Sequence, residues 1–231
     1  MVVNEVDRPV IPEPLGQNTG IVGDGVDRIP DGVYSGGLLA SGGGWVFRQR
    51  SWTPVPLALV LVFVRWHSTH LFALFIAGEA VVAIGLAIRF WGVSHIGGIS
   101  RTRAARLGPL TSTGPYLLVR NPLYVGNFLM WTGFVLASQL VWMLPVAWIV
   151  FAVQYGAIVR FEEGALVRHF GAAYVDYARR VPRWALRVSR LGAALRTPRL
   201  HGWRAVAFSE RGGLIAAAVM SILLFAKFRW A

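Results

Sequence analysis

The chain has 231 residues, of which 55% are hydrophobic and only 15% are charged, and its formal net charge is +12. About a quarter of the residues of a typical soluble domain are charged, so this composition argues against an ordinary soluble protein. Cysteine is absent, which excludes disulfides, thiolate chemistry and cysteine metal sites. A basic excess points to nucleic acid or to an anionic membrane surface, and the long apolar runs favour the membrane.

Residues 1–44 differ in composition from the rest of the chain. They are rich in Gly and Pro, contain no Trp or Phe, and hold six acidic and two basic residues, which gives them a net charge of −4. This composition predicts a disordered N-terminal tail. Its polar start gives no sign of a cleavable signal peptide. We therefore expect one membrane domain over residues 45–231.

Five apolar runs follow the tail, and aromatic residues stand at several of their ends, as in membrane-interface belts. The first run is short for a membrane crossing, and the third and fourth are separated only by Ser138-Gln139, which predicts a tight helical hairpin. The runs are Pro54–Trp66, Leu71–Trp91, Leu123–Ala137, Leu140–Val159 and Gly212–Phe228. The sequence thus predicts an all-α, polytopic membrane protein with about five transmembrane helices.

Arginine is concentrated in two of the connecting segments, residues 92–121 and residues 160–211. The turn His67–His70 and the turn at Ser138-Gln139 contain none. By the positive-inside rule, the two basic segments are predicted to be cytoplasmic, which gives a cytoplasmic N-terminus and an external C-terminus. We expect a multi-pass protein of a bacterial inner membrane.

Residues 164–184 have apolar side chains at helical spacing, with the charged residues on other faces. The apolar positions are Leu166, Phe170, Tyr174, Tyr177 and Val181. This pattern predicts an amphipathic helix that lies on the cytoplasmic interface. A helix of this kind could serve only as a surface anchor.

Acidic residues are scarce after Asp31, and a membrane protein rarely keeps a carboxylate near a span without a partner or a task. Glu162 and Glu163 stand where the fourth run ends, and a carboxylate there could bind an ammonium group or ribose hydroxyls. The alternative is a solvated pair beside Arg160. For Glu79, inside the second run, a structural hydrogen bond is favoured over a polar cavity. The five acids are Glu79, Glu162, Glu163, Asp176 and Glu210.

The densest local signal is GPYLLVRNPLYVGN, residues 114–127, at the entry to the third run. Pro122 suits the first turn of a helix, where its missing N–H costs nothing, and Asn121 then stands at the N-cap. A helix N-terminus leaves N–H groups and a positive dipole end for an anion, so this is a natural position for a ligand carboxylate. Capping alone does not explain the flanking tyrosines and arginine.

This block is followed about 35 residues later by EEGALVRHFGAAYVDYARRVPRW. Together the two blocks resemble the isoprenylcysteine carboxyl methyltransferase family and the related phospholipid N-methyltransferases. The resemblance covers roughly residues 85–185 and leaves out the tail and the last apolar run. The order and separation of both blocks make it specific.

The resemblance implies S-adenosylmethionine bound on the cytoplasmic side, in a region of about residues 101–127 and 160–185, and a lipid-like acceptor that enters from the bilayer. The catalytic residues are expected to be Glu162 and Arg160, which is near the glutamate pair but not at the register of the family's acceptor-binding arginine. The family often has histidine where this chain has Asn121, and since an amide takes no proton, Asn121 is not expected to be a general base. The implied cofactor residues are Leu110, Thr111, Tyr116, Asn121, Pro122, Leu123, Tyr124 and Glu162.

Two other function classes remain open at this stage. One is an intramembrane sterol-type reductase that uses NADPH, and the other is a non-enzymatic membrane scaffold or small transporter. The methyl acceptor could be a carboxylate or an amine. No metal site is expected, because His67 and His70 have no nearby carboxylate. No nucleic-acid partner is expected either.

Overall fold

The computed structural model describes residue 49 and residues 52–65, 71–97 and 109–230, and every regular element in these ranges is a helix. This confirms the all-α prediction. The predicted tail and the turn His67–His70 lie outside the described residues. The elements are α2 (Val55–Phe63), α3 (Leu71–Ile96), η2 (Gly114–Leu117), α4 (Pro122–Ala137), η3 (Val141–Met143), α5 (Leu144–Phe170), α6 (Ala172–Arg180), η4 (Val188–Arg190), α7 (Leu191–Arg196) and α8 (Trp203–Trp230).

In the part of the chain that the structure describes, three helical stretches are long and apolar enough to cross a membrane: Phe72–Ile96, Val141–Phe170 and Trp203–Arg229. The 16 residues of α4 and the 9 of α2 are shorter. At 1.5 Å per residue, α4 is about 24 Å long, which is less than the roughly 30 Å of a bilayer's hydrocarbon core. The predicted count of five crossings is therefore not confirmed and stays a prediction.

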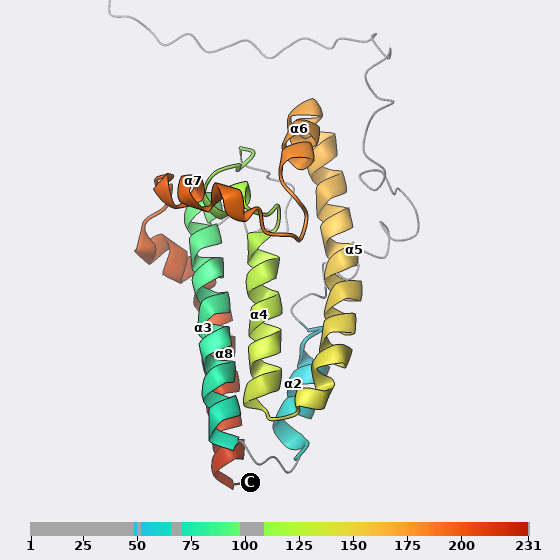
Figure 1. Cartoon of the computed structure of the whole chain (residues 1–231), viewed down its shortest axis with the longest axis vertical. Helices are drawn as coiled ribbons and strands as arrows, with labels where there is room; N and C mark the ends of the chain where they lie inside the picture. The colour runs from blue at the N-terminus through green and yellow to red at the C-terminus, as the bar shows by residue number, and fades with distance from the viewer. Residues whose placement is uncertain (1–48, 50–51, 66–70, 98–108, 231) are drawn as a thin grey trace, which may run out of the picture.

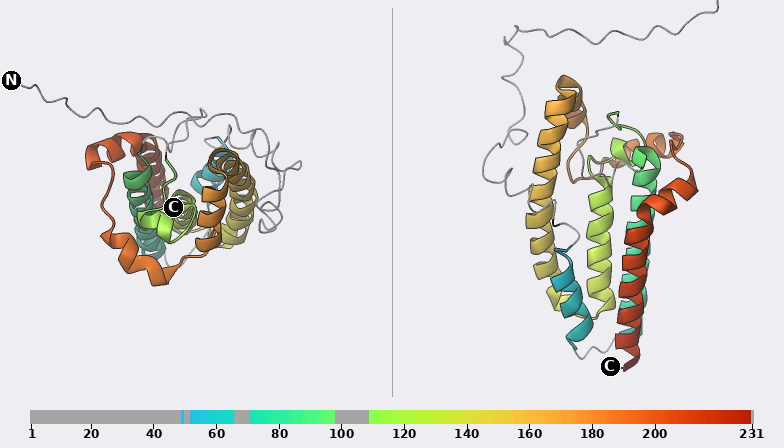
Figure 2. Two further views of the ribbon diagram at one scale, coloured as in Figure 1. Left: turned by 90° about the horizontal axis from the view of Figure 1, so that it is seen from above. Right: turned by 180° about the vertical axis from the view of Figure 1, so that it is seen from behind.

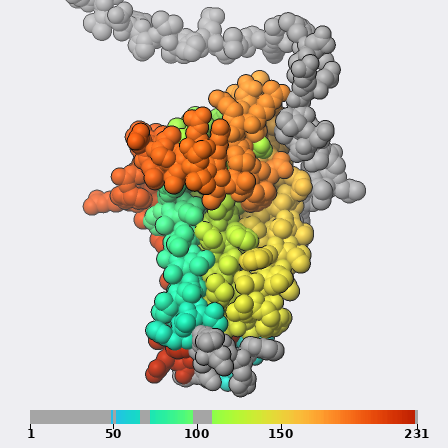
Figure 3. Space-filling model, viewed as in Figure 1, coloured from blue at the N-terminus to red at the C-terminus, as the bar shows by residue number. Residues whose placement is uncertain are grey.

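The long helices stand roughly side by side, with α3 next to both α4 and α8 (Figure 1). Both α6 and α7 lie at the same end of the bundle, and the C-terminus lies at the other end. Seen from above, the chain between α6 and α8 runs around the outside of the α6–α7 end (Figure 2). In the space-filling view it forms a continuous band across that end (Figure 3).

Glycines let α3 and α4 pack at very short range. A side chain at Gly85 would place its Cβ 2.7 Å from the Gly126 carbonyl oxygen, and one at Gly133 would place its Cβ 2.6 Å from the Gly78 oxygen. Real Cβ atoms do not approach backbone that closely, so the two helices meet only because small residues face each other, as is common between membrane helices. This antiparallel contact fixes the start of α4 beside the end of α3.

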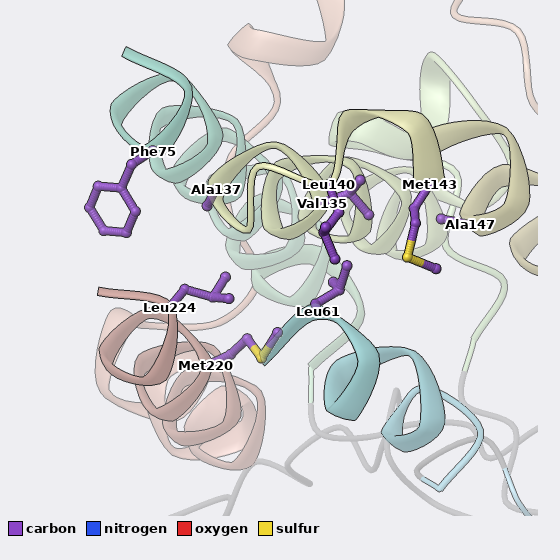
Figure 4. Close-up of a cluster of buried hydrophobic side chains, with 9 residues drawn as sticks. All are labelled: Leu61, Phe75, Val135, Ala137, Leu140, Met143, Ala147, Met220 and Leu224. Carbon is purple, nitrogen blue, oxygen red and sulfur yellow. The ribbon is translucent and has the colours of Figure 1, made fainter. Parts of the chain in front are cut away.

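The end of the bundle away from α6 and α7 is held by an apolar cluster from α2, α3, α8, the end of α4, the start of α5 and the turn between them (Figure 4). Lys227 of α8 also bridges this end, since its Nζ donates hydrogen bonds to the Leu61 oxygen at 2.7 Å and the Ser138 oxygen at 3.1 Å. The cluster comprises Leu61, Phe75, Val135, Ala137, Leu140, Met143, Ala147, Met220 and Leu224. The polar site discussed below is at the other end.

The outer faces of the long helices are apolar and exposed. On α5, Ile149 and Val153 are 64% and 71% exposed, and on α8, Ile215 and Ile222 are 62% and 65% exposed. Apolar side chains that point outward along such lengths match a lipid environment rather than water.

Two predicted elements differ from the structure. The single amphipathic helix over residues 164–184 is wrong, because α5 continues to Phe170 and the chain breaks at Gly171, which has φ +53°. Tyr174 and Tyr177 of α6 are buried against α5 rather than turned to a membrane surface. The last helix begins at Trp203 rather than Gly212, which brings Glu210 inside α8.

Candidate active site

The site lies at the start of α4. The turn before this helix contains Gly114, and steric contacts explain why this residue is a glycine. Gly114 has φ +58°, and a Cβ there would meet the ring of His95 at the end of α3. The His95 Nδ1 lies 3.2 Å from the Thr113 hydroxyl oxygen, so the ring is held against the turn. Glycine is required both by the backbone conformation and by the histidine ring.

Asn121 occupies the N-cap position and Pro122 begins the helix, as predicted. The Asn121 side chain, however, makes no capping hydrogen bond. Its Nδ2 is buried and has no hydrogen-bond partner among the described residues. Buried polar groups nearly always have a partner, so this amide is a candidate to bind a ligand.

Glu163 is the centre of a buried ion cluster, which we call the Glu163 hub (Glu163, Arg120 and Arg183). Its carboxylate is 2% exposed and accepts hydrogen bonds from Arg120 Nη1 at 3.2 Å and from Arg183 Nη2 at 2.5 Å. The hydrogen bonding of Arg183 to the Glu163 carboxylate raises the pKa of Arg183. Arg120 also donates to the backbone oxygens of Val181, at 2.6 Å, and of Ala178. The hub therefore joins the start of α4, α5 and the chain after α6.

Further contacts bind these segments into one unit. The Tyr177 hydroxyl donates to the Tyr116 backbone oxygen at 2.9 Å. Leu110 packs on the apolar cluster formed by α5, α6 and Val181. Thr111 is partly buried in the segment that leads into η2. A cavity of about 180 Å³ adjoins Tyr177 and is lined by three arginines, Arg180, Arg187 and Arg190.

Glu162 has different surroundings from Glu163, because neighbouring helical residues point about 100° apart. It is half-buried and accepts a hydrogen bond of 2.8 Å from the Tyr124 hydroxyl of α4. We call these two residues the Tyr124–Glu162 pair. The Tyr124 ring packs on that of Tyr155, with centroids 4.9 Å apart. Two residues from the two separate sequence blocks thus meet between α4 and α5.

Tyr116 lies close to this pair. Its side chain is 6% exposed, and its hydroxyl has no hydrogen-bond partner among the described residues. Burial raises the pKa of this phenol, and the neighbouring Tyr177 and the Glu162 carboxylate raise it further. Tyr116 therefore stays protonated at neutral pH and can donate or accept one hydrogen bond.

The other predicted site residues are not all brought together. Arg160 is exposed, and its Nη1 donates to the Gly156 oxygen of its own helix at 3.3 Å. It precedes Glu162 by two residues, which places it about 200° around α5, on another face. Leu123 packs against Gly92 of α3. Arg160 and Glu162 therefore point to different sides of α5, and the catalytic role expected for both stays a prediction.

A second polar network was missed by reasoning from the sequence. Arg89 of α3 donates through Nε and Nη2 to Glu210 of α8 at 2.9 and 2.7 Å, and through Nη1 to the Asn127 Oδ1 at 2.6 Å. Asn127 in turn donates to the Tyr155 hydroxyl at 2.9 Å. The sequence did contain a signal for this network. Arg89 stands at the end of one apolar run and Glu210 shortly before another, and charged residues in membrane helices need partners.

Residues 73–173 match the family model described as phospholipid methyltransferase. Three curated relatives are similar over part of the chain. The nickel-cobalt-cadmium resistance protein NccN of Alcaligenes xylosoxydans xylosoxydans is 32% identical over 58% of this chain and 61% of its own length. The cobalt-zinc-cadmium resistance protein CzcN of Cupriavidus metallidurans is 32% identical over 54% of this chain and 53% of its own length.

The third relative is protein-S-isoprenylcysteine O-methyltransferase B of Arabidopsis thaliana, which is 30% identical over 51% of this chain and 58% of its own length. The chain thus spans little more than half the length of these relatives. No solved structure matches it. The resemblance predicted from the two motif blocks is confirmed. The family match includes the Tyr124–Glu162 pair but ends before Arg183 and Glu210. Within the described ranges, no three His, Asp or Glu side chains are grouped as metal ligands.

Proposed function

We propose that this chain, whose residues 73–173 match the phospholipid methyltransferase family, transfers a methyl group from S-adenosylmethionine to a lipid-like acceptor in the membrane. The observation that carries the proposal is the Tyr124–Glu162 pair, which lies near two polar groups without partners, Tyr116 Oη and Asn121 Nδ2. The Arabidopsis relative, named an isoprenylcysteine O-methyltransferase, supports an acceptor with an apolar tail. The names of the two metal-resistance relatives specify no acceptor.

The polar groups at the start of α4 fit the functional groups of this cofactor. Asn121 offers an amide N–H, and the positive end of the α4 dipole lies beside it, so this side suits the methionine carboxylate. Glu162 offers a carboxylate, which suits the cofactor's ammonium group or its ribose hydroxyls. Tyr116 adds a neutral hydroxyl, which can pair with either kind of group.

When bound, S-adenosylmethionine supplies an electrophilic methyl group on a sulfonium, which leaves as a neutral thioether. Little acid assistance is needed, so the chain's contribution is positioning and exclusion of water. Tyr124 holds the Glu162 carboxylate in one orientation through its hydroxyl. The Tyr124 ring packs against the apolar cluster that contains the rings of Phe151, Tyr155 and Trp131. Asn121 takes no proton, so an amine acceptor must arrive deprotonated or lose its proton to another group.

The proposal includes the location of the site. We infer from the positive-inside rule that the arginine-rich α6–α7 end lies on the cytoplasmic side, in a bacterial inner membrane. Residues 45–231 then act as a single methyltransferase domain, and the acceptor reaches the pair from the bilayer.

The decisive experiment is calorimetry of the full chain in detergent, titrated separately with S-adenosylmethionine and with NADPH. We expect saturable binding of S-adenosylmethionine and none of NADPH. Binding of NADPH alone would favour the sterol-type reductase. Binding of neither would favour a scaffold or transporter and would overturn the proposal.

A further inference from the structure

A continuous set of contacts joins the last long helix to the Tyr124–Glu162 pair. It begins at Glu210 of α8, which is 1% exposed and ion-paired with Arg89 at 2.7 Å. Arg89 binds Asn127, and Asn127 binds the Tyr155 hydroxyl. The Tyr155 ring then packs on Tyr124, whose hydroxyl binds Glu162. We call Glu210, Arg89, Asn127 and Tyr155 the Arg89 network.

Asn127 can link the orientation of Tyr155 to that of Arg89, because one end of its amide accepts hydrogen bonds and the other end donates them. The Oδ1 accepts from Arg89 at 2.6 Å, so the Nδ2 must point the other way, where it donates to the Tyr155 hydroxyl at 2.9 Å. Without the arginine, the amide could turn over and present its oxygen to Tyr155 instead. The position of Arg89 therefore decides which atom Tyr155 meets.

The local packing also depends on this arginine. A Cβ at Gly126 would lie 2.6 Å from Arg89 Cγ, so the glycine leaves room for the aliphatic part of Arg89 to cross α4 and reach Asn127. Gly126 and Asn127 belong to the same motif block as Tyr124. The block thus contains both a member of the pair and the two residues that receive Arg89.

Stability alone is a weak reason for such a network. Desolvation of a buried ion pair can exceed its Coulombic gain, and apolar residues of similar volume often do as well. Ionisable residues inside membrane helices are costly, and those present generally mark a functional site. Glu210 lies outside the family match, which ends at residue 173, so its place in the network follows from the structure alone.

We propose that Glu210 of α8 is a positioning residue for the Tyr124–Glu162 pair, acting through Arg89, Asn127 and Tyr155. The last long helix thereby becomes part of the site rather than only a membrane anchor. This inference rests on the proposed function for its catalytic meaning, but the positioning itself can be measured without any ligand.

The test uses the full chain labelled with 3-fluorotyrosine and studied by fluorine NMR in detergent. The chain has only six tyrosines, so Tyr124 and Tyr155 can each be assigned with a Phe variant. Glu210→Gln is expected to shift or broaden the signals of these two residues. The signals of Tyr174 and Tyr177, which pack beside the Glu163 hub, are expected to stay in place. Unchanged Tyr124 and Tyr155 signals would overturn the proposal.

Glu79→Gln is the matched control, since Glu79 makes a second polar contact between α3 and α8. The Ser221 hydroxyl of α8 donates to its Oε2 at 2.7 Å, away from the Arg89 network. This control should leave the Tyr124 and Tyr155 signals unmoved, and equal shifts in both variants would refute a specific role for Glu210. If Glu210→Gln does not fold, the double variant Arg89→Gln with Glu210→Gln leaves no unpaired charge and must shift or broaden the Tyr124 and Tyr155 signals.

A second measurement links positioning to the proposed cofactor site. S-adenosylmethionine affinity should fall about tenfold in Glu210→Gln, and this loss should nearly vanish in a Tyr124→Phe background, because coupled residues are non-additive. Additive losses would mean that Glu210 acts independently of the pair and would overturn the inference. If the wild-type chain binds no S-adenosylmethionine, the proposed function fails, whereas the fluorine signals still decide the positioning.

Discussion

Glu162 and Glu163 are adjacent on α5, yet they belong to two different regions of the molecule. Glu163 is 2% exposed and is bound by two arginines, of which Arg120 also donates to the Val181 backbone oxygen after α6. Glu162 is half-buried and bound by the hydroxyl of Tyr124, near the unpartnered groups of Tyr116 and Asn121. Glu163 holds segments of the chain together, whereas Glu162 lies near groups that can bind a ligand.

The comparison shows that one helix, α5, carries a structural carboxylate and a candidate ligand-binding carboxylate at adjacent positions. An ion cluster with several charge-assisted hydrogen bonds is rigid, and removing one member leaves buried charges unpaired. A carboxylate has about four lone-pair sites, so one that accepts from a neutral hydroxyl can also accept hydrogen bonds from a ligand. Four substitutions test this division, and they are given below from the largest expected effect to the smallest.

Glu163→Gln should have the largest effect, on stability. It leaves Arg120 and Arg183 without a buried counter-charge, and breaking a buried pair in this way costs about 3–5 kcal/mol. Thermal unfolding of the purified chain in detergent measures the loss. Arg160→Ala is the control, because Arg160 is exposed on the same helix and should change neither stability nor cofactor affinity. A fully stable Glu163→Gln variant would mean that the hub is not structural.

Glu162→Gln should have the opposite profile. Loss of a hydrogen bond between charged groups costs about 1.5–3 kcal/mol, which corresponds to roughly 10- to 150-fold weaker binding of S-adenosylmethionine. Stability should change little, since the amide still accepts from Tyr124. Calorimetry and thermal unfolding on the same sample separate the two effects. Unchanged affinity would place the cofactor away from the pair.

Asn121→Ala should weaken S-adenosylmethionine binding by about tenfold, at the lower end of that range, because the α4 N-terminus continues to attract the ligand's carboxylate. The Asn121 side chain makes no capping hydrogen bond, so its removal should not destabilise α4. Calorimetry gives the affinity, and helix content by circular dichroism gives the structural control. A destabilised α4 with normal affinity would assign Asn121 to folding instead.

Glu79→Gln should have the smallest effect, about 1 kcal/mol of stability or less, because an amide oxygen can still accept from the Ser221 hydroxyl. We expect normal cofactor affinity. The structure supports the prediction that Glu79 has a structural hydrogen bond, and the partner is Ser221 rather than an arginine. A large loss of affinity in this variant would extend the ligand-binding region far along α3.

Much of this arrangement could be predicted from the sequence. The long apolar runs determine the helical class, because a membrane forces backbone groups to bond within each segment. Pro122 predicts the start of α4, since proline fits only the first turn of a helix. The two motif blocks predict a meeting of the α4 start with Glu162, and the structure brings Tyr124 and Glu162 within a hydrogen bond.

Other features were decided only by the tertiary structure, and the reason is the range of the interactions. Local spacing does not tell which of two adjacent glutamates meets Arg120, because that depends on how α5 is rotated against α4. The helix break at Gly171 also depends on tertiary packing, since α6 turns back and buries Tyr174 against α5. Arg89 and Glu210 are 121 positions apart, so their pairing exists only after α3 and α8 pack side by side.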